Sequence, residues 1–143
     1  MSDFYKEYLS ESEEDTEKIG AEFAKELKKG DFVAFFGNLG SGKTAFVRGV
    51  ASVLCKGAHV SSPTYAIVNE YIGNIDIFHF DMYRITDDDS LYSVGFYDYQ
   101  DRNGIIFTEW SENIEFALPE NRYDVTFVKT GETGRKITVQ KRQ

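Results

Sequence analysis

The segment Gly37-Asn38-Leu39-Gly40-Ser41-Gly42-Lys43-Thr44 combines three glycines with a lysine and a threonine in the spacing G-x-x-x-x-G-K-[ST]. Because glycine has no Cβ, successive backbone N–H groups can come close to phosphate oxygens and point at them. Lys43 adds a point charge for the β- and γ-phosphates, and the Thr44 hydroxyl is a ligand that suits Mg²⁺. An apolar run precedes the segment and a helical pattern follows it. The spacing and its setting predict a loop that binds the phosphates of a nucleotide.

Two acidic residues follow apolar runs elsewhere in the chain. Asp81 ends the run that begins at Ile75, and Glu109 ends the run that begins at Ile105. Open α/β sheets bind ligands at the carboxyl ends of their strands, and a magnesium-bound triphosphate needs an acid there. A single acid at a strand end is often only a cap or a turn former. Two such acids beside a phosphate loop favour a role in binding the metal or a water molecule.

Other side chains near these acids allow both a structural and a functional interpretation. His79 shares a face with Asp81 if the segment is extended, but a lone histidine among aromatic residues is more often a core or hydrogen-bonded residue than a ligand. Tyr83 and Arg84 fit ordinary strand-end packing, or a switch that senses the γ-phosphate. Trp110, the only tryptophan, fits a core position, a cover over the nucleotide or a surface for a partner.

Two further segments are open to the same choice. Ser62-Pro63-Thr64 fits a loop that enters a strand, and also a phosphate-sensing switch. Cys55 is expected to be a small apolar filler at a helix end.

The elements that must position these residues follow from capping signals and hydrophobic periodicity. Ser12 and Asp15 match a capping box, and Lys28-Lys29-Gly30 matches a helix end, so a helix is expected over 12–29. The acidic run at its start is expected to be a solvated first turn rather than a disordered tail. A second helix is expected after the loop, because Val47, Val50, Ala51 and Leu54 recur at helical spacing.

Strands are expected wherever short runs are rich in β-branched and aromatic residues. The segments are 31–36, 64–72, 75–81, 105–108, 123–129 and 135–140, with one hairpin at Gly73-Asn74 and another at 130–134. Hairpins beside a strand–loop–helix crossover predict one α/β domain over 1–143 with a mixed central sheet flanked by helices. Residues 1–11 are expected to be a flexible or short N-terminal segment.

Composition limits the class of protein. The 143 residues carry 16 Lys and Arg against 24 Asp and Glu, a net charge of -8, so non-specific binding to nucleic acid is disfavoured. One cysteine excludes an intrachain disulfide, and the start of the chain lacks the pattern of a signal peptide. The longest apolar runs are far shorter than the roughly 20 residues of a membrane span. A cytoplasmic protein without membrane contact is expected.

Several classes of nucleotide-binding protein remain to be distinguished. A Ras-type GTPase needs Asn-Lys-x-Asp, and no asparagine in this chain is followed by lysine, although Asp101-Arg102-Asn103-Gly104 matches D-x-x-G. A small-molecule kinase and a nucleotide-gated interaction module without meaningful turnover are the alternatives to an ATPase.

Four segments in this order and spacing resemble the bacterial TsaE proteins, also called YjeE. They are Gly37 to Thr44, Ser62-Pro63-Thr64-Tyr65, His79-Phe80-Asp81-Met82-Tyr83-Arg84 and Glu109-Trp110. That family is the ATPase component of tRNA threonylcarbamoyladenosine biosynthesis. The likeness extends from the helix near Ser12 to the hairpin that contains Arg135. Segment 86–97 departs from the acids that family members often carry there.

The resemblance implies a P-loop fold. It also implies that the bound nucleotide is ATP with Mg²⁺ rather than GTP. It implies catalytic roles for Lys43, Asp81 and Glu109, and metal ligands at Thr44 and Glu109. The residues expected to bind the nucleotide are Ser12, Gly37, Asn38, Leu39, Gly40, Ser41, Gly42, Lys43, Thr44, Ala45, Asp81 and Arg135.

The resemblance also implies partners. The proteins TsaD and TsaB are the expected ones, and tRNA is expected to meet this chain only through their complex. The residues expected in switches or partner contacts are Ser62, Pro63, Thr64, Tyr83, Arg84 and Trp110.

Overall fold

The computed structural model describes residues 5–37, 42–60 and 67–142 of the chain. The strands are β1 (Tyr5–Ser10), β2 (Phe32–Gly37), β3 (Val68–Tyr71), β4 (Ile77–Asp81), β5 (Ile105–Glu109), β6 (Arg122–Lys129) and β7 (Arg135–Arg142). The α-helices are α1 (Glu13–Phe23), α2 (Lys43–Leu54), α3 (Asp88–Ser93) and α4 (Phe96–Gln100), and two 3₁₀ segments are η1 (Ala24–Glu26) and η2 (Ser111–Ala117).

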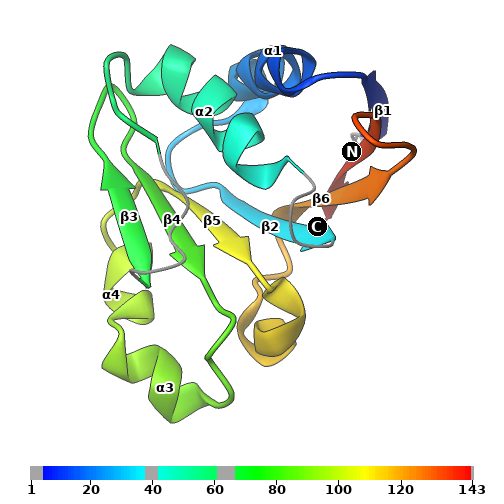
Figure 1. Cartoon of the computed structure of the whole chain (residues 1–143). Helices are drawn as coiled ribbons and strands as arrows, with labels where there is room; N and C mark the ends of the chain where they lie inside the picture. Colours follow the sequence, from blue (N-terminus) through cyan, green and yellow to red (C-terminus); the bar gives the residue numbers. More distant parts are fainter. Residues whose placement is uncertain (1–4, 38–41, 61–66, 143) are drawn as a thin grey trace.

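The strands form one mixed sheet in the order β1-β7-β6-β2-β5-β4-β3 (Figure 1). Strand β2 lies parallel to β5 and β6, and β4 lies parallel to β5. The pairs β1–β7, β6–β7 and β3–β4 are antiparallel. The carboxyl ends of β2, β5 and β4 therefore meet at one edge of the sheet.

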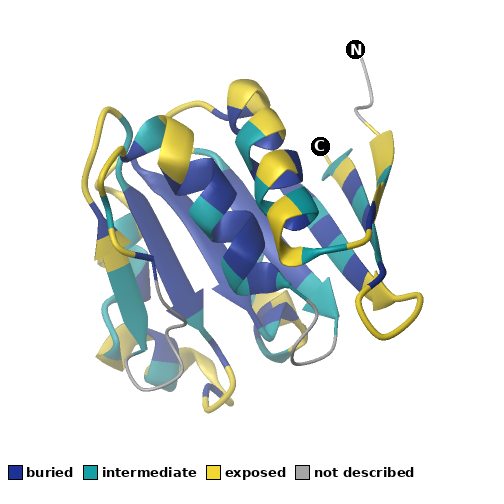
Figure 2. Cartoon of the chain, turned by 45° about the horizontal axis from the view of Figure 1, so that its top comes forward, coloured by how far each residue is buried: buried dark blue, intermediate teal, exposed yellow. Residues whose placement is uncertain are grey.

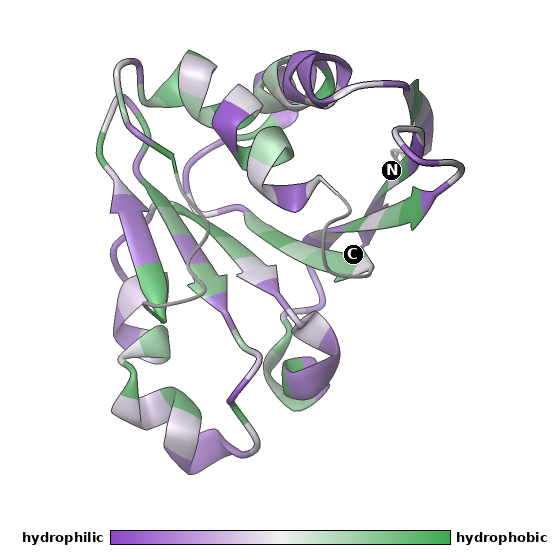
Figure 3. Cartoon of the chain, viewed as in Figure 1, coloured by the Kyte–Doolittle hydropathy of each residue, from purple (hydrophilic) through white to green (hydrophobic). Residues whose placement is uncertain are grey.

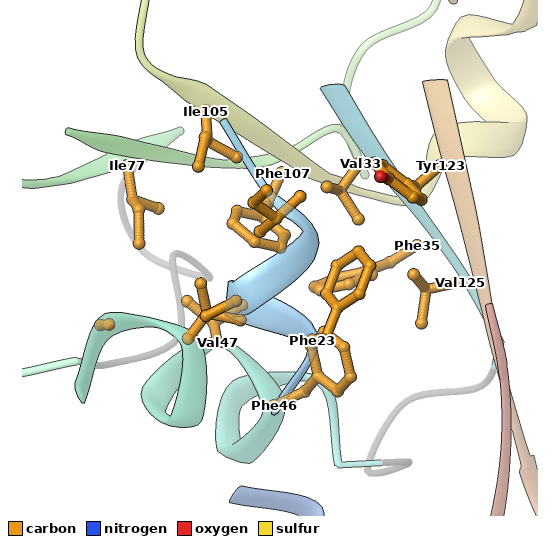
Figure 4. Close-up of a cluster of buried hydrophobic side chains, with 14 of the residues drawn as sticks. Phe23, Val33, Phe35, Phe46, Val47, Ile77, Ile105, Phe107, Tyr123 and Val125 are labelled. Atoms are coloured by element: carbon orange, nitrogen blue, oxygen red, sulfur yellow. The ribbon is translucent and has the colours of Figure 1, made fainter. Parts of the chain in front are cut away.

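Both faces of the central strands are buried, as is usual for parallel strands (Figure 2). One face packs against α1 and α2 through Phe23 and Phe46, and the Phe46 ring contacts Phe35 of β2, which in turn contacts Phe107 of β5 (Figure 4). The other face packs against Leu91 of α3 and its neighbours in α4 and η2. Hydropathy agrees with this division, because much of α1 is hydrophilic whereas the central strand β2 is hydrophobic (Figure 3). Alternate residues of the central strands β2, β4 and β5 thus face the two layers.

Helices α1 and α2 pack closely because a glycine of each faces the backbone of the other. A Cβ on Gly20 would lie 2.2 Å from the Phe46 carbonyl oxygen, and a Cβ on Gly49 would lie 2.0 Å from the Glu17 carbonyl oxygen. Real Cβ atoms do not approach this closely, so only glycine fits at both positions. The close crossing fixes the start of α2 against the start of α1.

Most of the predicted elements are confirmed. Ser12 caps α1 by accepting the Asp15 N–H at 3.1 Å, and the strands at 31–36, 105–108, 123–129 and 135–140 lie within one or two residues of their predicted bounds. The first helix ends at Phe23 and continues as 3₁₀ turns to Glu26, short of the expected 12–29. The acidic first turn is solvated, since Glu13 and Glu14 are exposed.

Other elements differ from the sequence patterns. The hairpin of β3 and β4 exists, but residues 72–76 connect the strands where a two-residue turn was expected. Tyr5–Ser10 form an edge strand against β7, and α3, α4 and η2 were not predicted. Among the described residues, none of the helices combines the length and apolar character that a membrane crossing requires.

Candidate functional site

The site lies where β2, β4 and β5 end beside the start of α2. Gly37, Asp81 and Glu109 are the last residues of these strands, on the face covered by α2. Asp81 is the direct register partner of Glu109 across the parallel pair β4–β5. Because neighbouring strands lie about 4.8 Å apart, the two carboxyl groups project from adjacent positions. The expectation that both acids lie at one edge of the sheet is met.

The start of α2 faces the same edge. Gly42 is its N-cap with φ 99° and ψ 11°, a left-handed conformation that glycine adopts without strain, and Lys43, Thr44 and Ala45 form the first turn. Lys43 is 8% exposed as a residue, and its ammonium donates to the Gly37 carbonyl at 2.7 Å. A helix N-terminus with free N–H groups and a lysine beside it attracts anions.

Burial and neighbouring groups act in opposite directions on the pKa values of Lys43 and Asp81 at this edge. Burial lowers the pKa of Lys43, while the carboxylates of Glu109, Glu112 and Asp81 act to raise it. Burial raises the pKa of Asp81, against the Tyr83 backbone N–H, which donates to its carboxylate at 2.9 Å. A buried cation thus lies within electrostatic reach of three acids, which is the arrangement expected where phosphates and a divalent cation bind together.

Glu109 has a specific partner in the neighbouring strand. His79 Nε2 lies 2.6 Å from Glu109 Oε2, and the histidine is fully buried. The prediction that His79 is a core or hydrogen-bonded residue is confirmed, because the side chain is both buried and hydrogen-bonded. The identity of its partner was not predicted, because nothing in the sequence links two residues thirty positions apart.

An aromatic pair lies next to the two acids. The rings of Tyr83 and Trp110 contact each other at a tilt of 55°, with centroids 4.9 Å apart, and Tyr83 is 58% exposed. Asn113 holds the segment by donating to the Met82 carbonyl at 2.9 Å and the Tyr83 carbonyl at 3.1 Å. Trp110 has φ 59° and ψ 43°, a left-handed conformation that is rare for such a residue and that turns the chain directly after Glu109. Arg84, the next residue after Tyr83, is exposed.

Ser12 and Arg135 lie at the same end of the sheet but have other hydrogen-bond partners. The Ser12 hydroxyl caps α1, and Arg135 donates to the Gly134 carbonyl at 2.8 Å. Arg135 pairs in register with Ser10, whose hydroxyl lies 2.7 Å from that of Thr16. Thr16 in turn lies beside Gly42, within 3.5 Å of a Cβ built there. The start of α1 is thereby next to the start of α2.

Several predicted site residues lie outside the described part of the chain. They are Asn38, Leu39, Gly40 and Ser41 of the predicted phosphate loop, and Ser62, Pro63 and Thr64 of the predicted switch. Of the loop, the structure describes Gly37 at one end and Gly42 to Thr44 at the other.

The donor set suits a metal ion held mainly by its nucleotide. No group of three His, Cys, Asp or Glu side chains within residues 5–37, 42–60 and 67–142 is arranged to hold a metal by itself. Magnesium typically takes one or two protein oxygens together with phosphate oxygens and waters. The Thr44 hydroxyl and the Glu109 carboxylate, both at this edge, fit that pattern.

Two residues of the site were missed by sequence reasoning. The carboxylate of Glu112 acts to raise the pKa of Lys43, and Asn113 donates to the Tyr83 carbonyl. Glu112 and Asn113 follow the Glu109-Trp110 pair closely in the chain, so their nearness to a strand-end acid was the available signal.

Comparison with known proteins gives consistent results. A family model described as "Threonylcarbamoyl adenosine biosynthesis protein TsaE" matches residues 10–137. A Bacillus subtilis protein named "tRNA threonylcarbamoyladenosine biosynthesis protein TsaE" is 35% identical over 126 residues, which cover 87% of this chain and 78% of that protein. A Treponema pallidum protein of the same name is 30% identical over 131 residues, covering 92% of this chain and 97% of that protein.

The fold is shared with a solved structure. The crystal structure of Bacillus subtilis YdiB superposes with a TM-score of 0.79 and 28% sequence identity, covering 100% of this chain and 89% of that one. The α/β arrangement described above is therefore the arrangement of that protein.

Proposed function

Because the chain belongs to the TsaE family, we propose that it binds ATP with Mg²⁺ and hydrolyses it slowly as a component of tRNA threonylcarbamoyladenosine biosynthesis. In this proposal it acts in the cytoplasm with TsaD and TsaB, and ATP hydrolysis resets or remodels their complex. The modification acts on N6 of adenosine, and tRNA meets this chain only through that complex.

One arrangement carries the proposal. The buried Lys43 ammonium at the start of α2 lies within electrostatic reach of Asp81 and Glu109, which end neighbouring strands. A glycine-rich turn that served only to connect a strand to a helix would not require two acidic side chains at the same edge of the sheet. ATP rather than GTP is favoured because the sequence lacks the Asn-Lys-x-Asp that reads guanine.

Each residue at the edge has a role in this proposal. Lys43 donates to the β- and γ-phosphates, and Thr44 and Glu109 hold the magnesium ion. Asp81 lies near the γ-phosphate and orients the attacking water. When bound, magnesium neutralises charge on the phosphate oxygens and so favours cleavage of the terminal phosphate. Contacts along Gly37 to Ala45 bind the phosphates, and Ser12 and Arg135 are proposed to lie near the base or ribose.

Partner contact is proposed for the aromatic pair Tyr83 and Trp110, of which Tyr83 is exposed and Trp110 half-buried. The two rings contact each other beside the acids and line an open hollow of about 610 Å³ together with Ile85, Thr86 and Asn113. An exposed ring next to a nucleotide site can respond to the nucleotide and face a partner at the same time. Arg84 and the segment Ser62 to Thr64 complete the proposed switch surface.

Two substitutions separate nucleotide binding from turnover. Lys43→Ala is expected to abolish measurable ATP affinity, because it removes the buried cation that faces the phosphates. Glu109→Ala is expected to lower kcat by about 100-fold or more while ATP affinity changes far less, as for the loss of a group that acts mainly in the transition state. ATP binding is measured by calorimetry, and phosphate release by a coupled assay.

Exposed residues of the same types provide controls. Lys56→Ala and Glu120→Ala remove charges away from the site and should leave both quantities unchanged. Normal ATP hydrolysis by Glu109→Ala would show that the proposed metal ligand is wrong.

The pathway assignment needs its own test. Phosphate release is measured for the chain alone and with TsaD and TsaB, and the partners are expected to accelerate it. A strain that lacks the chain is expected to lose threonylcarbamoyladenosine from its tRNA, as measured by mass spectrometry of tRNA nucleosides. Retention of the modified nucleoside would contradict the proposal, and phosphate transfer to an added metabolite would favour a small-molecule kinase.

A further inference from the structure

His79 is a polar side chain in an apolar place. It is fully buried in the middle of β4, with its ring against Phe35 at 6.3 Å and Phe107 at 6.4 Å between centroids. Its Nδ1 atom is buried and has no hydrogen-bond partner in the described part of the chain. Leaving a buried polar atom unpaired costs free energy, and an apolar side chain of similar size would avoid that cost. Packing alone therefore does not account for a histidine here.

The other ring nitrogen makes the contact that does account for it. Nε2 lies 2.6 Å from Glu109 Oε2. A metal-binding carboxylate is ionised and can only accept, so in this inference Nε2 is the donor of the bond. His79 lies on the same face of β4 as Asp81, two residues earlier, so it reaches Glu109 from the interior side. Glu109 is itself 8% exposed and ends its strand. The imidazole thus binds the Glu109 carboxylate from the interior of the protein.

The bond divides the two oxygens of Glu109 between two tasks. Oε2 is bonded to the imidazole, so we infer that Oε1 is the oxygen available to a ligand at the edge of the sheet where Lys43 and Asp81 lie. The chain direction at Glu109 is fixed as well, because its carbonyl accepts the Met82 N–H at 3.0 Å and Trp110 turns away in a left-handed conformation. Backbone and side chain of Glu109 are therefore both held before any ligand binds.

We propose that His79 is a positioning residue, which holds the Glu109 carboxylate in the one orientation that presents a free oxygen to the nucleotide-bound metal ion. The inference rests on the proposed Mg²⁺–ATP function of the site and adds a residue to it. Outer partners of metal ligands generally change metal affinity or activity by about 10–100-fold when removed. An effect of that size is expected here, although His79 does not touch the nucleotide.

The test uses two substitutions that differ in one donor. His79→Phe keeps a ring between Phe35 and Phe107 but removes the N–H, whereas His79→Gln offers an amide N–H at a similar distance from the backbone. The affinity for Mn²⁺ is measured by electron paramagnetic resonance in the presence of a saturating non-hydrolysable ATP analogue. His79→Phe is expected to raise the Kd for Mn²⁺ by about 10-fold or more, and His79→Gln to recover most of that loss. Affinity for the analogue in EDTA should stay within about 2-fold for both, because Lys43 is untouched.

A matched control separates positioning from damage to the strand. Phe78 is the preceding residue of β4, equally buried, and faces the opposite layer against Tyr99. Phe78→Leu is therefore expected to lower thermal stability and leave the Kd for Mn²⁺ unchanged. An unaltered Kd in His79→Phe, or an equal loss in Phe78→Leu, would overturn the inference. A wild-type chain that bound no Mn²⁺–nucleotide at all would instead refute the proposed function, and the inference with it.

A second measurement does not depend on a histidine variant that folds. The chain has two histidines, and His59 is exposed, so ¹⁵N-histidine NMR gives one reporter and one internal reference. His79 is expected to show a protonated Nε2 and a bare Nδ1, with a resonance that moves in Glu109→Ala while that of His59 does not. A proton found on Nδ1, or a His79 signal indifferent to Glu109→Ala, would exclude the bond on which the inference depends.

Discussion

At the scale of single residues, the candidate site concentrates charge at a cost to the fold. Lys43, Asp81 and Glu109 are held at one partly buried edge, and burial acts against the charged form of the lysine and of Asp81. Residues that would rather be solvated persist in such places when a ligand supplies what the protein lacks, and phosphates with a divalent cation would do so here. The protein should therefore have a lower free energy of unfolding than a variant in which these charged side chains are replaced by neutral ones.

Asp81→Asn tests this cost directly. Burial raises the pKa of Asp81 above its ordinary value of 3.8, so the folded chain holds the proton more tightly than the unfolded chain. For a carboxyl of this kind, stability falls as pH rises from the unfolded pKa through the folded pKa, and the loss is complete above both. Asparagine can still accept the Tyr83 N–H and carries no charge. The variant is thus expected to be the more stable protein at neutral pH.

The measurement is urea unfolding of both proteins between about pH 4 and pH 7.5. The stability advantage of Asp81→Asn should be largest at the neutral end and shrink as pH falls toward the unfolded pKa. An advantage that did not change with pH would mean that ionisation of Asp81 is not its origin.

The residues also show what a sequence can and cannot predict about such a site. Asp81 and Glu109 could be found because each directly follows an apolar run, and strand ends of a parallel sheet converge. The hydrogen-bond partner of His79 could not be predicted, because it depends on the register of β4 against β5. That register aligns His79 with Phe107 and brings Nε2 to Glu109. A register is a property of two strands together and is absent from either one alone.

At the scale of elements, the orientation of the site depends on how α1 and α2 cross. Gly20 and Gly49 lie in the middle of helices, where glycine is normally unfavourable by about 0.5–1 kcal/mol relative to alanine. The backbone of the facing helix occupies the space that a Cβ would need at both positions. Helix propensity alone therefore predicts that alanine would stabilise the protein at both positions, which is the wrong sign. The two glycines are explained by the close packing of α1 against α2.

Gly49→Ala is expected to destabilise the fold by about 1–3 kcal/mol, in spite of the better helix propensity of alanine, because the new methyl group would overlap the Glu17 carbonyl. Ser52→Ala, at an exposed position of the same helix, should change stability by less than about 0.5 kcal/mol. Free energies of unfolding from urea titrations measure both. A Gly49→Ala protein as stable as the wild type would show that the helices can separate at little cost.

Elements also differ in how well the sequence indicates them. The strands of the central sheet and the two hairpins could be predicted because their apolar runs are bounded by turn residues. Helices α3 and α4 have six and five residues, too few for a helical period to be recognised. Each is stabilised because one of its side chains, Leu91 or Phe96, is buried in the core on the sheet face opposite α1 and α2. The edge strand β1 is mostly exposed and exists through its pairing with β7, which lies far away in the sequence.

At the scale of the whole molecule, a net charge of -8 sets which anions the chain can hold. A nucleotide is bound over a few ångströms, where backbone N–H groups and Lys43 act at close range. A nucleic acid is bound over a long surface, where the summed field matters, and repulsion extends about 8 Å at physiological salt. The same protein can thus suit one phosphate ligand and repel another.

The isolated chain is accordingly expected to bind tRNA no more tightly than about 10⁻⁴ M at physiological salt, the weak end of non-specific binding, because it presents acids where an RNA-binding surface presents lysine and arginine. Fluorescence anisotropy with labelled tRNA, at about 50 mM and 200 mM KCl, measures this. Basic partners should restore association when they are added, since they supply the cations that this chain lacks. Tight binding by the chain alone that weakens steeply with salt would show that counterions are released from its own surface, and would place tRNA in direct contact with it.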